Sequence, residues 1–243
     1  MRVKTSAALT GILAATAATA QNATSTCATG VYIIVARGSN EAPGSGRIGS
    51  VANGTFAAIP GSQIAPLDYP ATFDNYSTSV AAGAVALNAA LTSYNARCPN
   101  SKVALLGYSQ SAGKEVIAVI LFGDPTHNVS ASWNKGTSKR NGLFPRENVT
   151  KCEAYASKIE SYCDTGDIYC DLGNNTAVHG SYFANYTDDA VEFIWAQYSA
   201  SKSSNGSSPT AAPTTVPGSG AADSAPGLLM SLAGLSMLAA FIL

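Results

Sequence analysis

The pattern of apolar and polar residues predicts that strands and helices alternate along the chain. Three short runs are almost continuously apolar and rich in β-branched residues: Val31 to Ala36, Lys102 to Gly107 and Val116 to Phe122. Such runs are typical of strands buried on both faces, as in a parallel sheet. Ser79 to Tyr94 and Asp188 to Tyr198 instead carry apolar residues at helical spacing, which predicts amphipathic helices. The expected fold is α/β, a three-layer sandwich with a mainly parallel central sheet.

The N-terminal end departs from this pattern. Residues 1–20 open with the basic stretch Met1-Arg2-Val3-Lys4, continue through an apolar run and end with Ala18-Thr19-Ala20. This order predicts a secretory signal peptide that is cleaved before Gln21. We therefore expect a secreted, extracellular protein.

The C-terminal end predicts a linker followed by an anchor signal. Residues 199–226 are nearly all Ser, Thr, Ala, Pro and Gly, a composition that cannot bury enough apolar surface to fold. The apolar segment 227–243 would reach only about 25 Å as a helix, short for a membrane span. Small residues at 218–222 precede it. This favours a removable signal for a glycosylphosphatidylinositol (GPI) anchor in the outer leaflet over a retained transmembrane helix. Residues 21–198 then form one domain.

Charge and composition exclude some classes of partner. The chain has 14 Lys+Arg against 15 Asp+Glu, and only 12% of its residues are charged. Without a basic stripe we expect no nucleic-acid partner, and we expect a monomer that acts on a neutral substrate. Eight N-x-Ser/Thr sequons predict a glycosylated surface; they begin at Asn22, Asn53, Asn75, Asn128, Asn148, Asn174, Asn185 and Asn205.

The five cysteines predict two disulfides and one unpaired residue, Cys152. Cys163 and Cys170 enclose a short loop and are expected to pair with each other. A Cys27–Cys98 bridge would close a long loop, which the chain-entropy estimate credits with about 4 kcal/mol of stability. A zinc site formed by Cys163, Cys170 and His179 is the rival interpretation. We disfavour it because secreted cysteines are usually oxidised and no C-x-x-C pair is present, so no metal is expected.

A candidate nucleophile directly follows the second predicted strand. The sequence there is Gly107-Tyr108-Ser109-Gln110-Ser111, with a small residue two positions to either side of Ser109. Small residues permit a tight strand-to-helix turn, which presents the serine Oγ and lets the next N–H bind an oxyanion. Ser111 stands where a glycine would make the pattern stronger. The motif predicts Ser109 as a nucleophile.

The base that such a serine needs has two candidates, because the chain has only two histidines. Asp124 with His127 and Asp167 with His179 both follow the order Ser, Asp, His used by α/β-hydrolases. Order alone does not decide between them. Only three positions separate Asp124 from His127, which leaves little chain to bring both to a common site, whereas twelve separate Asp167 from His179. We favour the second pair and interpret the first as turn or packing residues.

Several motifs together resemble the cutinase and acetylxylan esterase family over about Cys27 to Tyr198. In order they are Ala36-Arg37-Gly38-Ser39, Tyr69-Pro70-Ala71, Cys98-Pro99, Gly107-Tyr108-Ser109-Gln110, Leu121-Phe122-Gly123-Asp124-Pro125, Cys163 through Asp167 to Cys170, and Val178-His179. The resemblance implies a cutinase-like fold and the same two disulfides as the cysteine spacing.

The resemblance also implies a mechanism. Ser109 would be the nucleophile, His179 the general base and Asp167 its orienting carboxylate, with Ser39 and the Gln110 amide forming the oxyanion hole. The implied reaction is two-step acyl transfer on a carboxylic ester, which needs no metal or organic cofactor.

One departure from the family pattern concerns the connection after the serine. The resemblance implies a substantial helix there, but only residues 110–115 separate Ser109 from Val116, whereas a parallel crossover normally takes a dozen or more residues. We hypothesise that an internal segment is missing, through exon skipping, a gene-model artefact or a real deletion. We further hypothesise that it carried a cysteine able to bridge Cys152. If the junction is genuine, Val116 to Phe122 would be free to shift register, pair antiparallel or leave the sheet.

Three functions stay open at this point. A deacetylase of acetylated xylan or a related plant polysaccharide is favoured by Val178-His179 followed by Tyr182 and Tyr186, as in acetylxylan esterases. A cutinase acting on the polyester cutin would need an apolar rim around Ser109, which the sequence does not map. A catalytically inactive cell-surface glycoprotein is favoured by the shortened connection, the sequons and the C-terminal segment.

Overall fold

The computed structural model describes residues 26–109 and 116–203. The predicted signal peptide, the predicted anchor signal and most of the predicted linker lie outside the described residues. Within the two described ranges, no helix is both long enough and apolar enough to cross a membrane.

The described residues form one sheet of six strands in the order β2-β1-β3-β4-β6-β5. Every neighbouring pair is parallel. The strands are β1 (Val31–Ala36), β2 (Gln63–Pro66), β3 (Lys102–Tyr108), β4 (Ala118–Phe122), β5 (Asn134–Lys135) and β6 (Ile159–Tyr162). A sheet of this kind brings the carboxyl ends of its strands to one edge, where ligands of α/β proteins bind.

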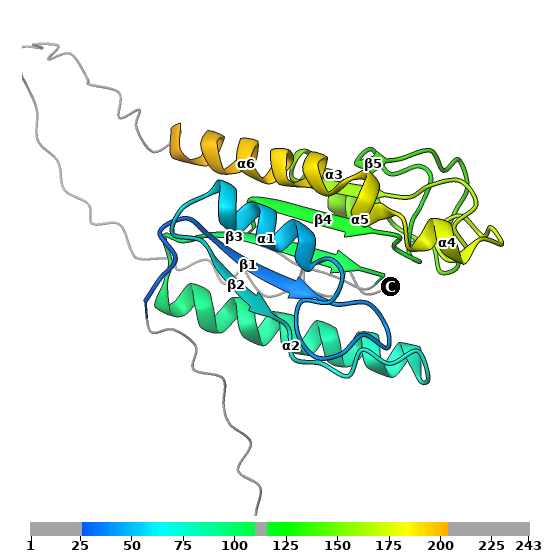
Figure 1. The fold of residues 1–243 in the computed structure, drawn as a ribbon, viewed down its shortest axis with the longest axis horizontal. Coiled ribbons are helices and arrows are strands. Elements are labelled where there is room, and N and C mark those ends of the chain that lie inside the picture. Colours follow the sequence, from blue (N-terminus) through cyan, green and yellow to red (C-terminus); the bar gives the residue numbers. More distant parts are fainter. Residues whose placement is uncertain (1–25, 110–115, 204–243) are drawn as a thin grey trace, which may run out of the picture.

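Helices cover both faces of the sheet (Figure 1). They are α1 (Gly49–Ala58), α2 (Tyr76–Arg97), α3 (Thr150–Glu153), the short 3-10 helix Ala156–Lys158, α4 (Thr176–His179), α5 (Tyr182–Asn185) and α6 (Thr187–Ser203). α1 and α6 pack on one face and α2 on the other. Along β1 the side chains alternate, so Ile33 and Val35 join the α1 and α6 cluster while Ile34 and Ala36 join the α2 cluster. The predicted three-layer sandwich is confirmed.

The predicted boundary of the linker is wrong by five residues. Helix α6 continues to Ser203, beyond the predicted linker start at Ser199. The serine hydroxyls bond to helix carbonyls one turn earlier, Ser199 Oγ to Trp195 O at 2.9 Å and Ser203 Oγ to Ser199 O at 3.2 Å. Satisfied in this way, serines are compatible with a helix, so composition alone placed its end too early.

The short connection after Ser109 leaves β4 in the sheet. β4 pairs with β3 in parallel, and Phe122 lies opposite Tyr108. The alternatives that the strand pairs antiparallel or leaves the sheet are therefore wrong, because the parallel pairing forms despite the short connection. A shift of register stays a hypothesis. The strand begins at Ala118, two residues later than expected. The described residues contain no helix between β3 and β4, and residues 110–115 lie outside them.

Two disulfides are present, Cys27–Cys98 and Cys163–Cys170, and these are the pairs expected from the sequence. Cys152 is buried and is not part of a disulfide. It lies in the apolar cluster on the α2 face. A helix in a right-handed crossover from β3 to β4 would pack against this same face. The reason is that α2 connects β2 to β3, and both connections move across the sheet in the same direction. The hypothesis that a lost segment carried a partner for Cys152 thus fits the fold and stays a prediction.

Candidate active site

Ser109 lies on a strained turn at the carboxyl end of β3. Its φ of 64° is in the left-handed region, which residues other than glycine seldom adopt. Two hydrogen bonds hold the turn: the Ser109 N–H donates to Phe122 O at 3.0 Å and the Tyr76 hydroxyl donates to Ser109 O at 3.1 Å. A sharp turn after a buried strand is the backbone that presents a nucleophilic serine in α/β-hydrolases.

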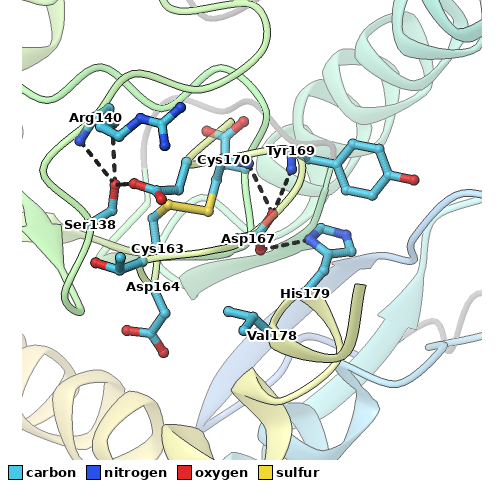
Figure 2. Close-up of a disulfide and its surroundings, with 12 residues drawn as sticks. Ser138, Arg140, Cys163, Asp164, Asp167, Tyr169, Cys170, Val178 and His179 are labelled. Atoms are coloured by element: carbon cyan, nitrogen blue, oxygen red, sulfur yellow. Dashed lines mark hydrogen bonds and ion pairs between the residues drawn. A yellow bond between two sulfur atoms is a disulfide. The ribbon is translucent and has the colours of Figure 1, made fainter. Parts of the chain in front are cut away.

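Asp167 and His179 form a buried hydrogen-bonded pair near the same edge of the sheet (Figure 2). His179 Nδ1 lies 2.8 Å from Asp167 Oδ2. The loop closed by Cys163–Cys170 holds the carboxylate, because its Oδ1 accepts from the N–H groups of Tyr169 at 2.7 Å and Cys170 at 3.0 Å. Both carboxylate oxygens are therefore fixed in direction, and so is the imidazole.

These hydrogen bonds keep Asp167 ionised although it is completely buried. Burial alone would raise the pKa of Asp167, but the hydrogen bond and charge of His179, together with donation from the Tyr169 N–H and from Tyr182, outweigh it. The pKa of Asp167 therefore lies below its ordinary value of 3.8. An ionised carboxylate on Nδ1 favours protonation of that nitrogen and leaves Nε2 as the basic atom of His179.

Tyr182 completes the support of the carboxylate, and motif reasoning gave it no role in the site. Its hydroxyl donates to Asp167 Oδ2 at 2.7 Å and accepts from the Asp164 N–H at 3.0 Å. Burial, followed by the charge of Asp167, raises the pKa of Tyr182 far above its ordinary value, so it remains a donor across the working pH range. The sequence signal for Tyr182 was its place shortly after Val178-His179, which favoured an acetylxylan esterase but did not indicate a contact with Asp167.

The backbone of Gly123 lies directly against the His179 ring. Gly123 has a φ of 59°, and a Cβ at this position would lie 2.8 Å from Nδ1 and Cε1 of His179. Any side chain here would push the imidazole away from Asp167, so the close approach requires glycine.

Tyr108 connects the serine turn to the histidine. Its hydroxyl donates to His179 O at 3.1 Å, and the two rings stack with centroids 4.9 Å apart. Because Tyr108 immediately precedes Ser109, this contact brings His179 to the end of β3 that carries the serine. Asp167, His179 and the serine turn thus meet at one edge of the sheet.

The other aspartate and histidine do not form such a pair. Asp124 Oδ1 accepts from the N–H and hydroxyl of Thr126, and Oδ2 lies 2.8 Å from Arg146 Nη2. Neither ring nitrogen of the buried His127 has a hydrogen-bond partner among the described residues. Burial lowers the pKa of His127; Asp124 opposes this and Arg146 adds to it, so the ring is neutral. These residues have the geometry of packing groups, in line with the interpretation of the sequence.

Comparison with known proteins places this geometry in a family. Residues 27–198 match the Cutinase family. The chain belongs to the cutinase family. Acetylxylan esterase 2 of Talaromyces purpureogenus is 31% identical over 199 residues, which cover 68% of this chain and 85% of that relative. Cutinase 11 of Verticillium dahliae is 32% identical over 220 residues, covering 76% and 72%.

Solved structures agree with this assignment. The catalytic core domain of acetyl xylan esterase from Trichoderma reesei matches with a TM-score of 0.65 and 30% identity, covering 69% of this chain and 98% of that one. With the family, the relatives and the fold in agreement, this cutinase-family protein is a carboxylic ester hydrolase.

Of the two residues expected to bind the oxyanion, the structure describes only Ser39. Ser39 of the cutinase-family protein follows β1 in a loop that Arg37 anchors, with Arg37 Nη2 donating to Tyr69 O at 2.7 Å and Nε to Glu41 O at 3.0 Å. Gln110 lies outside the described residues. Their role in oxyanion binding stays a prediction.

The zinc interpretation is wrong. The sulfurs of Cys163 and Cys170 are bonded to each other and cannot bind zinc as thiolates (Figure 2). Within residues 26–109 and 116–203, no other group of three histidine, cysteine, aspartate or glutamate side chains is arranged to hold a metal ion.

Proposed function

We propose that this esterase removes acetyl groups from acetylated xylan or a related plant polysaccharide through an acyl-enzyme on Ser109. The observation that carries the chemistry is the 2.8 Å hydrogen bond between Asp167 and His179 beside the serine turn. The preference for acetyl esters is supported by the likeness to acetylxylan esterases in both sequence and structure, at 31% identity for the Talaromyces purpureogenus protein and a TM-score of 0.65 for the Trichoderma reesei catalytic core. Sequence identity alone does not separate the two functions, because Cutinase 11 is 32% identical.

In the first half of the proposed reaction, His179 Nε2 takes the proton of Ser109 as Oγ attacks the acetyl carbonyl carbon. The carbonyl oxygen becomes an oxyanion, which Ser39 and the Gln110 amide would stabilise. The bond from the acetyl carbon to the sugar oxygen then breaks, and His179 returns the proton to that oxygen. The products are a free sugar hydroxyl and an acetyl group on Ser109.

In the second half, His179 removes a proton from water, and the resulting nucleophile attacks the acetyl carbon. The bond to Ser109 breaks, the serine regains its proton and acetate leaves. In both halves the imidazole becomes positively charged next to the ionised Asp167. The carboxylate therefore stabilises each transition state without accepting a proton itself.

The proposed place of action is outside the cell, with attachment to the outer leaflet through a GPI anchor. Two disulfides support an oxidising compartment, and the terminal segments support export and anchoring. The proposed partner is the neutral polymer itself, and the proposed oligomeric state is a monomer.

The decisive experiment compares the purified protein with Ser109→Ala on three readouts. The unchanged enzyme should release acetate from acetylxylan, hydrolyse p-nitrophenyl acetate and bind a fluorophosphonate probe. Ser109→Ala should lose about 10⁵-fold in turnover and all labelling, because the other groups retain only binding and oxyanion stabilisation. An unaltered melting temperature should accompany the loss.

Other outcomes would support the rival functions. Faster hydrolysis of p-nitrophenyl palmitate than of acetyl esters, without acetate release from xylan, would indicate a cutinase. A folded protein with neither labelling nor hydrolysis would indicate an inactive surface glycoprotein. Undiminished hydrolysis of p-nitrophenyl acetate by Ser109→Ala would reject Ser109 as the nucleophile.

A further inference from the structure

Four aromatic side chains form a continuous surface next to the proposed catalytic residues; we call them the aromatic rim. They are Phe73, Tyr76, Phe144 and Tyr169, from three separate segments of the chain. Neighbouring rings are in contact: the centroid distances are 6.4 Å for Phe73 and Tyr76, 6.0 Å for Phe73 and Tyr169, and 5.7 Å for Tyr76 and Phe144. Such distances are typical of interacting aromatic pairs.

Two members of the rim leave much of their apolar surface in solvent. Phe73 is 49% exposed and Phe144 is 51% exposed. Leu143, next to Phe144, is 43% exposed. Because isolated exposed apolar side chains are common but contiguous ones often mark a binding site, the clustering of these residues is what calls for an explanation.

The aromatic rim is continuous with the proposed catalytic residues. At one end, the Tyr169 ring packs against His179 with centroids 4.5 Å apart. In its middle, the Tyr76 hydroxyl donates to Ser109 O at 3.1 Å. A ligand that covers the exposed rings of Phe73 and Phe144 would therefore extend away from the serine turn across the surface.

The backbone of the rim is held in place without a ligand. The Phe73 N–H donates to Asn40 Oδ1 at 3.1 Å, the Leu143 N–H to Tyr169 O at 2.8 Å and the Phe144 N–H to Pro125 O at 2.9 Å. A preformed surface loses less conformational entropy on binding than one that must be ordered by its ligand.

The openness of the surface indicates what it binds. Sites for apolar groups usually enclose most of the ligand surface, but rings that are half in solvent can cover only one side of a ligand. Polar residues flank the exposed rings, including the exposed Asn40, Asp74 and Asn75. Flat apolar faces among hydrogen-bonding groups match a sugar ring, which has C–H groups on its faces and hydroxyls at its edge. An alkyl chain lacks those hydroxyls. The rim does supply the apolar surface beside Ser109 that a cutinase would need, but its half-exposed rings and polar flanks favour a sugar ring over an acyl chain.

We infer that the aromatic rim binds pyranose rings of the polysaccharide on the alcohol side of the ester, stacking them on Phe73 and Phe144. This inference rests on the proposed function and names the part of the substrate that the rim recognises. The acetyl group would lie toward Ser109 and the polymer backbone would continue across the rim.

The test uses Phe73→Ala, Phe144→Ala and the double variant on a large and a small substrate. Each single change should lower kcat/KM for acetylxylan about fivefold, and the double change about 20-fold, because a stacked ring is lost each time. Hydrolysis of p-nitrophenyl acetate should stay within about twofold, since this ester has no sugar ring to stack. The Asn75 sequon lies within the rim, so the enzyme should be deglycosylated before assay.

Phe56→Ala is the matched control. Phe56 is 53% exposed, as much as the rim phenylalanines, but it lies in the last turn of α1, which leads to the amino end of β2 at the opposite edge of the sheet. It should leave both activities unchanged.

A binding experiment without catalysis distinguishes failure of this inference from failure of the proposed function. In the Ser109→Ala background, Phe73→Ala should weaken the retardation of the protein in xylan-containing gels, whether or not the enzyme with Ser109 releases acetate from xylan. If Phe73→Ala weakens the retardation but the enzyme with Ser109 releases no acetate from xylan, the proposed function is rejected and the inference about the aromatic rim stands. Equal losses on both substrates, no loss on acetylxylan, or a selective loss on p-nitrophenyl butyrate would overturn the inference.

Discussion

The chain contains two aspartate and histidine pairs that differ in almost everything except composition and order. Asp167 bonds directly to His179, and three further donors surround its carboxylate. Asp124 instead lies beside Arg146, and the ring of His127 has no hydrogen-bond partner among the described residues.

The difference lies in what neutralises each buried carboxylate. For Asp167, neutral donors fix the two oxygens and leave the imidazole to share the charge. For Asp124, the permanently charged guanidinium of Arg146 balances the negative charge, and His127 makes no side-chain hydrogen bond to the carboxylate. A buried carboxylate whose charge is balanced by arginine is a structural group, whereas one that holds an imidazole can assist proton transfer.

The comparison predicts its largest effect when the histidines of the two pairs are changed: a large loss of activity for His179 and almost none for His127. His179→Ala should lower kcat for p-nitrophenyl acetate by about 10⁴-fold or more, because the serine loses its base. His127→Leu should stay within about threefold, since the backbone bonds of His127 to Asp124 O and from Gly142 N are kept and no described side-chain bond is lost. Similar losses in two equally folded variants would remove the distinction between the pairs.

The next effect is on stability and comes from Arg146. Arg146→Met removes the cation from a buried ion pair and should destabilise the fold by about 3–5 kcal/mol in urea unfolding, because Asp124 is left buried and unpaired. The double variant with Asp124→Asn should recover part of this loss. The folded fraction should retain its kcat. A drop in kcat at full folding would instead place Arg146 in the chemistry.

The smallest expected effect sharpens the role of Tyr182. Tyr182→Phe removes the hydroxyl that donates to Asp167 and should lower kcat about tenfold with little change in KM. The pKa of Asp167, now below 3.8, should rise toward that value. A lowered pKa contributes stability that is present above about pH 4 and lost as the pH falls through the folded-state pKa.

Urea unfolding at two pH values measures this contribution. The stability difference between the wild type and Tyr182→Phe should be larger at pH 6 than at pH 3. An equal difference at both pH values would mean that Tyr182 acts by packing alone.

The sequence predicted best the elements whose burial is uniform. β1 was predicted with the bounds that the structure shows, because every residue of Val31–Ala36 is apolar. The helix expected at Ser79 to Tyr94 extends three residues further at each end, to Tyr76 and Arg97, since the ends of a helix carry little apolar signal.

Elements that mix polar and small residues were missed. β6 contains Glu160 and Ser161 between apolar neighbours, and Glu160 is held by Lys135 and the Tyr162 hydroxyl, contacts that only the folded chain creates. α1 contains Gly54, which lowers helix propensity. That glycine is required by packing, because a Cβ there would lie 2.8 Å from Val191 of α6.

The candidate site was predictable in its residue types but not in its surroundings. The strand-turn motif pointed to Ser109, and residue spacing together with the family resemblance pointed to the Asp167 and His179 pair; their catalytic roles stay predictions. The aromatic rim could not be predicted, because its members come from three segments that are far apart in sequence and that the fold brings together largely through loops. Loop geometry of this kind leaves no periodic signal.

The ring closed by Cys163 and Cys170 has a practical consequence for making the protein. Closing so short a ring is worth about 2.5 kcal/mol by the entropy estimate, and the ring encloses Asp167 and both backbone donors to its Oδ1. A recombinant host whose cytosol keeps thiols reduced would yield this loop without its crosslink, and the two backbone donors to Oδ1 would then be held less firmly. Periplasmic or fungal secretory production is therefore the route that preserves the acidic half of the site.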